Sequence, residues 1–208
     1  MERLDLFLVR HAPAIHPKGI VPPHDPDADC TESSAFASLA RALPEKSPWW
    51  VSPLTRCRMT ADTLVAHGAT AASIIVDDRL REQDYGSFHG RPVAEVWEEI
   101  KDGPRSNWHF LHPSFCPPHG ESFLMLHDRM AAVIKAIEGA DTPSLVLVGH
   151  GMATRSLIAH ALDLPAENAL AFSISPLSLT RMTLIRTGGS SDPGNGGRWQ
   201  LDWLNRVY

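Results

Sequence analysis

Residues 6–13, LFLVRHAP, form an apolar run that ends in an arginine and a histidine. Runs of branched and aromatic side chains are typical of a buried strand. Pro13 has no backbone N–H and restricts the residue before it, so we expect the strand to end by Ala12. In α/β sheets, ligands bind at the carboxyl ends of the strands. Arg10 and His11 therefore lie where an anion, most naturally a phosphate, is expected to bind.

The composition is that of an ordinary globular protein, with 208 residues, 43% of them hydrophobic and 21% charged. We expect residues 1–208 to form a single domain. A net charge of -5 does not favour nucleic acid or an anionic membrane as a partner, so a phosphate site must depend on a local cluster of positive side chains. No apolar run has membrane-spanning length, and the start of the chain does not resemble a signal peptide. Three cysteines do not indicate a disulfide framework and favour a reducing cytoplasm.

Patterns typical of strands and helices alternate along the chain, and no internal repeat is visible. This alternation predicts an α/β fold: a single three-layer α/β/α domain whose sheet is mostly parallel, with an antiparallel hairpin at one edge. After the first strand, strands are expected at 49–51, 73–76, 144–148, 177–186 and 198–204. Helices are expected at 31–43, from 55 to a stop at Gly68, and at 92–100, 121–138 and 152–162, while the glycine-rich residues 188–197 are expected to form a hairpin loop.

Four junctions between a strand and the following segment carry polar side chains that suit one another. The first supplies Arg10 and His11, and the second places Arg56 in the first turn of a helix, where its guanidinium and the free N–H groups of the helix could both face an anion. The third supplies Glu82. The last places His150 between two glycines, which would let the backbone approach a ligand closely.

Together these residue types suit phosphoryl transfer. Two arginines and two histidines can bind a phosphoryl group through charge-assisted hydrogen bonds. A neutral imidazole among them can attack phosphorus and form a covalent intermediate. A nearby glutamate can protonate the leaving oxygen and later deprotonate the attacking water. Because the arginines and histidines supply the positive charge, no metal is needed.

The order of these motifs resembles that of the histidine phosphatase (phosphoglycerate mutase-like) superfamily, from the first strand to about residue 160. The matching motifs are Leu8-Val9-Arg10-His11, Ser52-Pro53-Leu54-Thr55-Arg56 with Thr60-Ala61, Leu80-Arg81-Glu82 with Gly86 and Gly90, Gly120-Glu121-Ser122, and Val148-Gly149-His150-Gly151.

The resemblance implies roles for five side chains. It makes His11 the phosphorylated nucleophile and Glu82 the proton donor. It places Arg10, Arg56 and His150 in the phosphate pocket, with His150 also counted among the catalytic residues. It further implies a single α/β domain without a cofactor that acts on a small-molecule phosphate ester.

The sequence departs from the common family pattern in three places. Ala12-Pro13 replaces the usual glycine and acidic residue, and His89 stands where a second glutamate is common. The loop 16–29 lacks the usual phosphate contacts rich in Asn and Gln. The Arg-His-Ala-Pro form is similar to a branch that includes α-ribazole phosphatase-like proteins. These departures leave the substrate open.

The sequence leaves three alternatives to a phosphatase open. A mutase would use the same chemistry but must exclude water from the site. Residues 16–29 and 107–120 show no pattern typical of an ordered cap that would do so. Hydrolysis is therefore the preferred prediction. A phospho-ligand binding protein without activity is the second alternative. The third is a zinc protein, because four side chains have spacings that could ligate a metal; they are His109, His112, Cys116 and His119.

The remaining histidines fall into two groups. His16, His24 and His89 either line the mouth of the pocket or are solvated loop residues, and the second interpretation is favoured. His67, His127 and His160 fall on expected helices and are interpreted as structural. The oligomeric state stays open, with a homodimer as one option.

Overall fold

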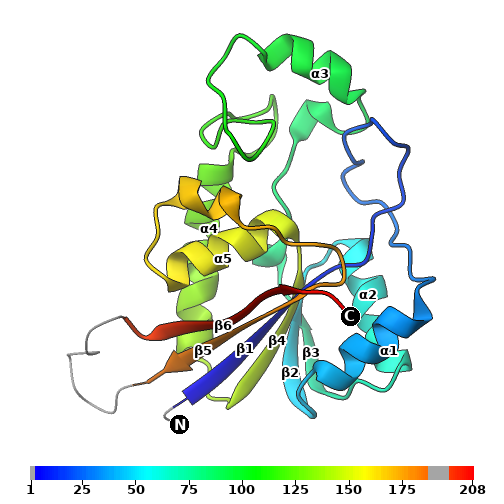
Figure 1. Ribbon diagram of the computed structural model, residues 1–208, viewed down its shortest axis with the longest axis vertical. Helices are drawn as coiled ribbons and strands as arrows, with labels where there is room; N and C mark the ends of the chain where they lie inside the picture. The colour runs from blue at the N-terminus through cyan, green and yellow to red at the C-terminus, as the bar shows by residue number, and fades with distance from the viewer. Residues whose placement is uncertain (1–2, 187–196) are drawn as a thin grey trace.

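The computed structural model describes residues 3–186 and 197–208 and contains one six-stranded sheet in the order β3-β2-β4-β1-β5-β6 (Figure 1). The first four strands in chain order run parallel to one another. At one edge, β5 pairs antiparallel with β1, and β6 pairs antiparallel with β5. The strands are β1 (Arg3–Arg10), β2 (Ser47–Val51), β3 (Ala71–Val76), β4 (Ser144–Gly149), β5 (Leu179–Ile185) and β6 (Trp199–Arg206). The predicted mostly parallel sheet with an antiparallel edge hairpin is confirmed.

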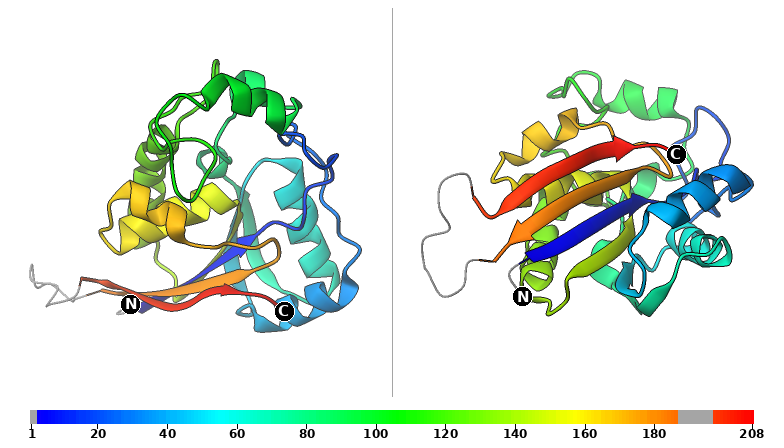
Figure 2. Two further views of the ribbon diagram at one scale, coloured as in Figure 1. Left: turned by 45° about the horizontal axis from the view of Figure 1, so that its top comes forward. Right: turned by 60° about the horizontal axis from the view of Figure 1, so that its bottom comes forward.

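Helices cover both faces of the sheet (Figure 2). They are α1 (Ser33–Ala42), α2 (Thr55–Ala66), α3 (Val93–Ile100), α4 (Phe123–Gly139) and α5 (Gly151–Ala161), with short 3-10 helices η1 (Asp78–Leu80), η2 (Gly86–Phe88) and η3 (Ala166–Ala171). Helices α4 and α5 contribute to one apolar cluster, and α1 and α2 contribute to another. The predicted three-layer arrangement is therefore confirmed.

Strand β1 holds the two layers together because its side chains alternate between the two faces of the sheet. Leu6 and Leu8 belong to the cluster under α4 and α5, whereas Phe7 and Val9 belong to the cluster under α1 and α2. All four side chains are at most 8% exposed. Burial of such side chains contributes roughly 1.5–3 kcal/mol each. The strand is thereby fixed in one register, and the residues at its end acquire a defined position.

The register of the sheet brings the functional junctions together. Arg10 of β1 lies opposite Gly149 of β4, and the backbone N–H of His11 donates to the carbonyl of Gly149 at 2.9 Å. Val51 of β2 lies opposite Val148, on the other side of β4. Since parallel strands end at the same edge of a sheet, the segments after β1, β2 and β4 meet at one place.

A third group of residues packs around η2 and α3, and α3 lies away from the sheet, at the top of Figure 1. Val21, Phe88, Val96 and Leu111 form an apolar cluster of their own, which joins the loop after β1 to η2, α3 and the segment after α3. Residues 16–29 and 107–120, where the sequence shows no pattern typical of an ordered cap, supply Val21 and Leu111 to this cluster. The backbone of these segments is irregular, so their apolar side chains pack without a helical or strand period that a sequence pattern could show.

The observed element limits differ from the predicted ones by a few residues. Helix α1 begins at Ser33, and α4 begins at Phe123 with Ser122 as its N-cap, its hydroxyl accepting the N–H of Met125 at 3.1 Å. Helix η3 was not predicted. The predicted loop 188–197 lies, except for Gly197, outside the described residues. Among the described residues, no helix is long and apolar enough to span a bilayer.

Candidate active site

The structure brings all five predicted site residues to the carboxyl edge of the sheet. Arg10, His11, Arg56 and Glu82 line a cavity of about 330 Å³. His150 does not line this cavity. Its ring is fully buried beside His11, with the ring centroids 5.0 Å apart. We call Arg10, His11, Arg56 and His150 the phosphate end of the site.

The backbone holds the His11 ring in one orientation. Its Nδ1 lies 2.6 Å from the carbonyl oxygen of its neighbour Ala12, a contact in which Nδ1–H is the donor. The Ala12 N–H in turn donates to the Thr60 hydroxyl at 2.9 Å, which ties this segment to α2. A proton on Nδ1 leaves the lone pair of a neutral ring on Nε2. Nε2 is therefore the atom of His11 that can act as a nucleophile.

Burial and two cations keep His11 neutral. Burial, the charge of Arg56 and, to a smaller extent, that of Arg10 lower the pKa of His11 to about 3, although the hydrogen bond to Ala12 opposes them. Arg56 Nε donates to His11 Nε2 at 3.2 Å, a geometry that requires an unprotonated Nε2. A ring that stays neutral over the physiological pH range can attack an electrophile without first losing a proton.

The side chain of Arg56 is fixed by the loop after β1. Its Nη1 donates to the carbonyl of His24 at 3.1 Å. Asp25 caps helix α2, because its carboxylate accepts the Thr55 N–H at 2.7 Å and the Thr55 hydroxyl at 2.8 Å. The Thr55 N–H is therefore not among the free N–H groups of this helix that the sequence analysis expected to face an anion. An acidic side chain of the chain itself occupies that position, and sequence reasoning missed Asp25 because the loop has no regular pattern.

Arg10 has an unused donor at the phosphate end. One of its terminal nitrogens donates to the carbonyl of Ile174. Its Nε is buried and has no hydrogen-bond partner among the described residues. A buried donor without a partner is costly, and it indicates a missing acceptor. A phosphoryl oxygen in the cavity would supply that acceptor.

Two side chains hold the ring of His150 in place. Its Nε2 lies 2.7 Å from the hydroxyl of Ser52 and 3.3 Å from the thiol of Cys57. Burial, followed by the nearby His11 and the two arginines, lowers the pKa of His150 well below its usual value. Cys57 is fully buried, and burial raises the pKa of its thiol, so this cysteine is not a thiolate nucleophile.

Glu82 approaches the site from the segment after η1. Both oxygens of its carboxylate lie 3.2 Å from the backbone N–H of Met152, in the first turn of α5. A carboxylate is favoured at this end of a helix because the first N–H groups have no partner within it. The contact places Glu82 at the same helix start that His150 precedes.

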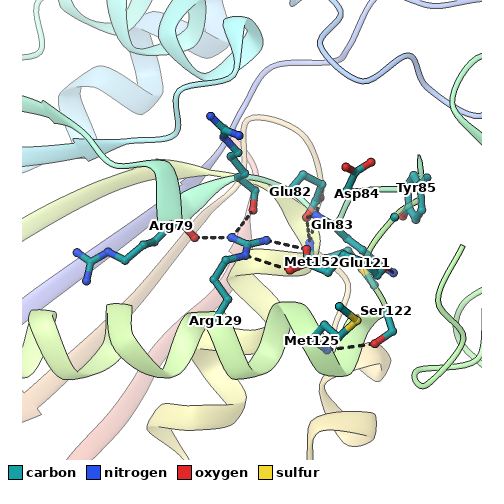
Figure 3. A network of polar contacts seen from close by, with 12 residues as sticks. Arg79, Glu82, Gln83, Asp84, Tyr85, Glu121, Ser122, Met125, Arg129 and Met152 are labelled. Atoms are coloured by element: carbon teal, nitrogen blue, oxygen red, sulfur yellow. Dashed lines mark hydrogen bonds and ion pairs between the residues drawn. The ribbon is translucent and has the colours of Figure 1, made fainter. Parts of the chain in front are cut away.

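Arg129 of α4 braces the segment that carries Glu82 (Figure 3). Its guanidinium donates to the carbonyls of Arg79 and Arg81 at 2.5 and 3.2 Å and binds the Glu121 carboxylate through two nitrogens at 2.8 and 3.1 Å. The Gln83 amide donates to the Glu121 carbonyl at 2.9 Å. The motif Gly120-Glu121-Ser122 therefore positions the proposed proton donor from a distance.

Two glycines allow this segment to dock closely. Gly86 has a φ of +51°, and a Cβ there would overlap the carbonyl oxygen of Pro118. A Cβ on Gly120 would lie 2.5 Å from the carbonyl oxygen of Asp84. Larger residues would push residues 82–86 away from residues 118–121.

A third arginine, Arg155, was missed by the sequence reasoning. It lies on α5, one helical turn after Gly151, and a Cβ on Gly151 would lie 3.2 Å from Arg155 and 3.5 Å from the Arg10 guanidinium. The absence of a side chain at Gly151 thus leaves room for two arginines, whereas the sequence prediction expected it to leave room for a ligand. The four-residue spacing from Gly151 was the signal that could have found Arg155.

Three histidines outside the phosphate end contribute to the cavity. His16, His24 and His89 all line it, as the interpretation that they lie at the mouth of the pocket expected. His24 is at the same time an exposed loop residue, whereas His89 is only partly exposed. The interpretation of His67, His127 and His160 as structural fits their contacts. The rings of His127 and His160 stack with their centroids 3.8 Å apart, and the ring of His67 stacks on that of Phe36 with the centroids 5.7 Å apart.

The zinc alternative does not agree with the side-chain positions. His109 Nε2 faces the Tyr85 hydroxyl, and the His112 ring bonds to Ser114. Across the described part of the chain, no three His, Cys, Asp or Glu side chains gather as a group that could hold a metal ion. The side chains of His109, His112, Cys116 and His119 have suitable spacing but do not converge.

A buried neutral histidine beside arginines and a carboxylate, at the carboxyl edge of a mostly parallel sheet, defines a class of phosphoryl-transfer proteins. A comparison with family models agrees with the resemblance found in the sequence motifs. Residues 6–192 match the model described as histidine phosphatase superfamily (branch 1). The chain belongs to this superfamily.

Several relatives of this chain are named as probable phosphoglycerate mutases. The chain is 33% identical over 157 residues to the probable phosphoglycerate mutase GpmB of Klebsiella pneumoniae subsp. pneumoniae, and the match covers 75% of this chain and 69% of that protein.

Two solved structures with similar folds are described as phosphatases. The mycobacterial glucosyl-3-phosphoglycerate phosphatase Rv2419c is 26% identical, with a TM-score of 0.75 and coverage of 98% of this chain and 99% of that one. A putative α-ribazole-5'-P phosphatase of Escherichia coli K-12 is 18% identical, with a TM-score of 0.78 and coverage of 98% and 96%, a likeness that concerns the fold alone.

Proposed function

We propose that the protein is a phosphomonoesterase that acts on a small phosphorylated metabolite through a phosphohistidine on His11. Glu82 is the proton donor, and Arg10, Arg56 and His150 bind the phosphoryl group. One observation carries the proposal: the neutral His11 ring, with Nδ1 held by the Ala12 carbonyl, directs its Nε2 lone pair toward Arg56 at the cavity.

In the first step, the bound phosphoryl group accepts the Arg56 Nε–H in place of His11 Nε2. The freed Nε2 lone pair attacks phosphorus and forms the N–P bond while the P–O bond to the alcohol breaks. Glu82, protonated at this stage, transfers its proton to the leaving oxygen. The arginines stabilise the charge on the equatorial phosphoryl oxygens. The free Nε of Arg10 and the guanidinium of Arg56 are the groups available for this purpose.

In the second step, the Glu82 carboxylate takes a proton from water, and the resulting hydroxide attacks phosphorus. The N–P bond breaks, inorganic phosphate leaves, and neutral His11 is restored with Glu82 protonated again. The positive charge in both steps comes from side chains, so the proposal includes neither a metal nor a cofactor. A cytoplasmic location remains an expectation.

The replacement of the usual family residues by Ala12-Pro13 is compatible with this proposal. The contacts of this segment with His11 and Thr60 are made by the Ala12 carbonyl and N–H, which any residue supplies. Among the described residues, those with positive φ do not include Ala12, so a glycine is not required there.

The test is hydrolysis of 4-nitrophenyl phosphate by the purified protein, with and without a chelator. We expect turnover that a chelator leaves unchanged and that His11→Ala removes without unfolding the chain. His119→Asn, at an exposed histidine with positive φ, is the matched control. Tight phosphate binding with no hydrolysis across a panel of esters would instead favour a binding protein.

A mutase is the second candidate because a 33% identical relative is named as one. The apolar cluster around Val96 also removes the argument that the chain lacks an ordered cap. Incubation with 3-phosphoglycerate separates the candidates: a phosphatase releases phosphate, whereas a mutase yields 2-phosphoglycerate without release.

A further inference from the structure

The lining of the cavity has two chemically different parts. His11, Arg10 and Arg56 form one part. Apart from these residues, Glu82 and Gln83, the cavity is lined mainly by prolines, imidazoles and one phenol. We call these residues the leaving-group wall, because the alcohol part of an ester bound at His11 extends toward the proton donor. The wall consists of Pro13, Ala14, His16, Pro22, Pro23, His24, Leu54, Tyr85, His89 and Pro176.

The leaving-group wall offers little to a second anion. Among the described residues that line the cavity, the only arginines are Arg10 and Arg56, and there is no lysine. Four members of the wall are prolines, which have no backbone N–H to donate. A carboxylate or phosphate placed there would lose part of its hydration without gaining an arginine or lysine of the wall as a partner, which is costly.

The neighbouring surface repels anions as well. A second cavity of about 310 Å³ shares Glu82 and His24 with the first, and the carboxylates of Asp78, Asp84 and Glu121 line it. Its two arginines are already paired: Arg129 binds Glu121 at 2.8 Å, and Arg81 binds Asp78 at 3.1 Å. A long substrate with a second negative charge would therefore meet carboxylates beyond Glu82.

Hydrogen bonds hold the wall in place before any ligand binds. His89 Nδ1 donates to the Pro22 carbonyl at 2.7 Å, while its Nε2 lies 2.9 Å from Asp84. Val21 and Gly90 are joined at 3.0 Å through the N–H of the glycine. The His24 ring stands edge-on to His89, with the centroids 5.3 Å apart. The wall is thus a preformed surface of flat rings.

We propose that the site selects phosphate monoesters whose alcohol part is uncharged, and that it discriminates against a second carboxylate or phosphate. The proposal rests on the proposed function and specifies its substrate class. A cavity of about 330 Å³ is large enough for a phosphoryl group and one or two rings.

Two pairs of esters test the proposal at pH 8, where imidazole is generally neutral. In the first pair, 4-(methoxycarbonyl)phenyl phosphate and 4-carboxyphenyl phosphate differ by one charge on a similar ring. In the second pair, glycerol 2-phosphate and 2-phosphoglycerate differ by a hydroxymethyl group in place of a carboxylate. We expect the uncharged member of each pair to have a kcat/KM about tenfold higher, mainly through KM.

A variant with an added cation makes the test specific to the wall. His24 lies at both cavities, and Arg56 contacts only its backbone carbonyl, so His24→Lys adds a charge without removing that contact. We expect the preference for the uncharged ester to shrink several-fold in this variant. Ala131→Lys, which adds the same charge at an exposed position on α4, should keep the wild-type preference.

The possible outcomes separate this proposal from the proposed function. Equal or faster turnover of the carboxylated esters would overturn the substrate class, while acid-labile phosphate on His11 would leave the phosphatase intact. If no ester is turned over, calorimetry with phenylphosphonate and 4-carboxyphenylphosphonate decides. Tighter binding of phenylphosphonate supports the wall even without catalysis; equal binding, or none, overturns the proposal.

Discussion

The phosphate end and the leaving-group wall of the same cavity are built in opposite ways. The phosphate end lies where β1 and β4 finish side by side, and His11 and His150 there are at most 5% exposed. The wall comes from irregular segments, held by contacts such as the one between His89 and the Pro22 carbonyl. The register of the sheet fixes the first region, whereas a few local hydrogen bonds fix the second.

This difference separates chemistry from selectivity. The orientation of the His11 ring depends on the Ala12 carbonyl and on Thr60, both supported by the core. The shape of the wall can change without moving these atoms, because loops tolerate substitution better than the elements that carry them. Substitutions at the phosphate end should therefore act on kcat, and substitutions in the wall should act on KM.

The largest effect is expected for Glu82→Gln, which removes the proton donor. We expect kcat for an alkyl ester such as glycerol 2-phosphate to fall roughly 10²- to 10⁴-fold. The rate of the first step with 4-nitrophenyl phosphate should fall less, because nitrophenolate leaves without a proton. Burst kinetics with both esters measure this difference, and Glu45→Gln at an exposed site is the control. An equal loss in the first step with both esters would contradict the role of Glu82.

A smaller effect is expected for Arg56→Lys. Lysine keeps the charge but cannot reproduce the contacts of the guanidinium with His11 and with the His24 carbonyl. We expect kcat/KM to fall roughly 10²-fold, as is typical when a donor to a transition state is lost. Steady-state kinetics beside Arg41→Lys, an exposed arginine on α1, provide the comparison. Near-normal activity would show that charge alone suffices.

The buried histidines should make the protein sensitive to acid. Because the pKa of His11 is about 3 in the folded protein and near 6.5 in an unfolded chain, the unfolded state binds more protons below pH 6.5. The stability is therefore complete above pH 6.5 and is lost as the pH falls toward 3, with a slope of about 1.4 kcal/mol per pH unit for this group. His150 acts in the same direction.

Urea denaturation between pH 7 and pH 4.5 tests this dependence. His11→Gln should lose less stability on acidification than the wild-type chain, whereas His119→Asn should follow the wild type. Identical pH slopes for wild type and His11→Gln would mean that His11 does not stay neutral in the folded state.

The smallest effect is expected in the wall. His89→Ala removes the contacts with the Pro22 carbonyl and with Asp84. We expect KM to rise about three- to tenfold, since the wall must then be ordered on binding, while kcat stays close to that of the wild type. His89→Gln, which keeps one donor, should recover part of the loss. A fall in kcat as large as that of Arg56→Lys would show that the wall also aligns the reacting atoms.

The same contrast explains how far the sequence could predict the molecule. The three-layer fold and the meeting of His11 with His150 follow from short apolar runs, each ending in a polar residue, because parallel strands end at one edge. Position along the chain was enough to find these residues.

The wall could not be predicted in this way. His24 and His89 lie 65 residues apart and meet through turns and prolines that carry no period. The apolar cluster around Val96 likewise consists of side chains from four separate segments. Arg129 and Asp25 act through backbone groups of distant loops, and such contacts appear only in three dimensions.

The most direct test of the account is to locate the phosphate in the covalent intermediate. The wild-type chain is mixed with 4-nitrophenyl phosphate, quenched in base within the first turnover and mapped by mass spectrometry. We predict acid-labile, base-stable phosphate on Nε2 of His11, because Nδ1 is held by the Ala12 carbonyl at 2.6 Å. Phosphate on Nδ1 or on another residue, or unimpaired turnover by His11→Ala, would contradict it.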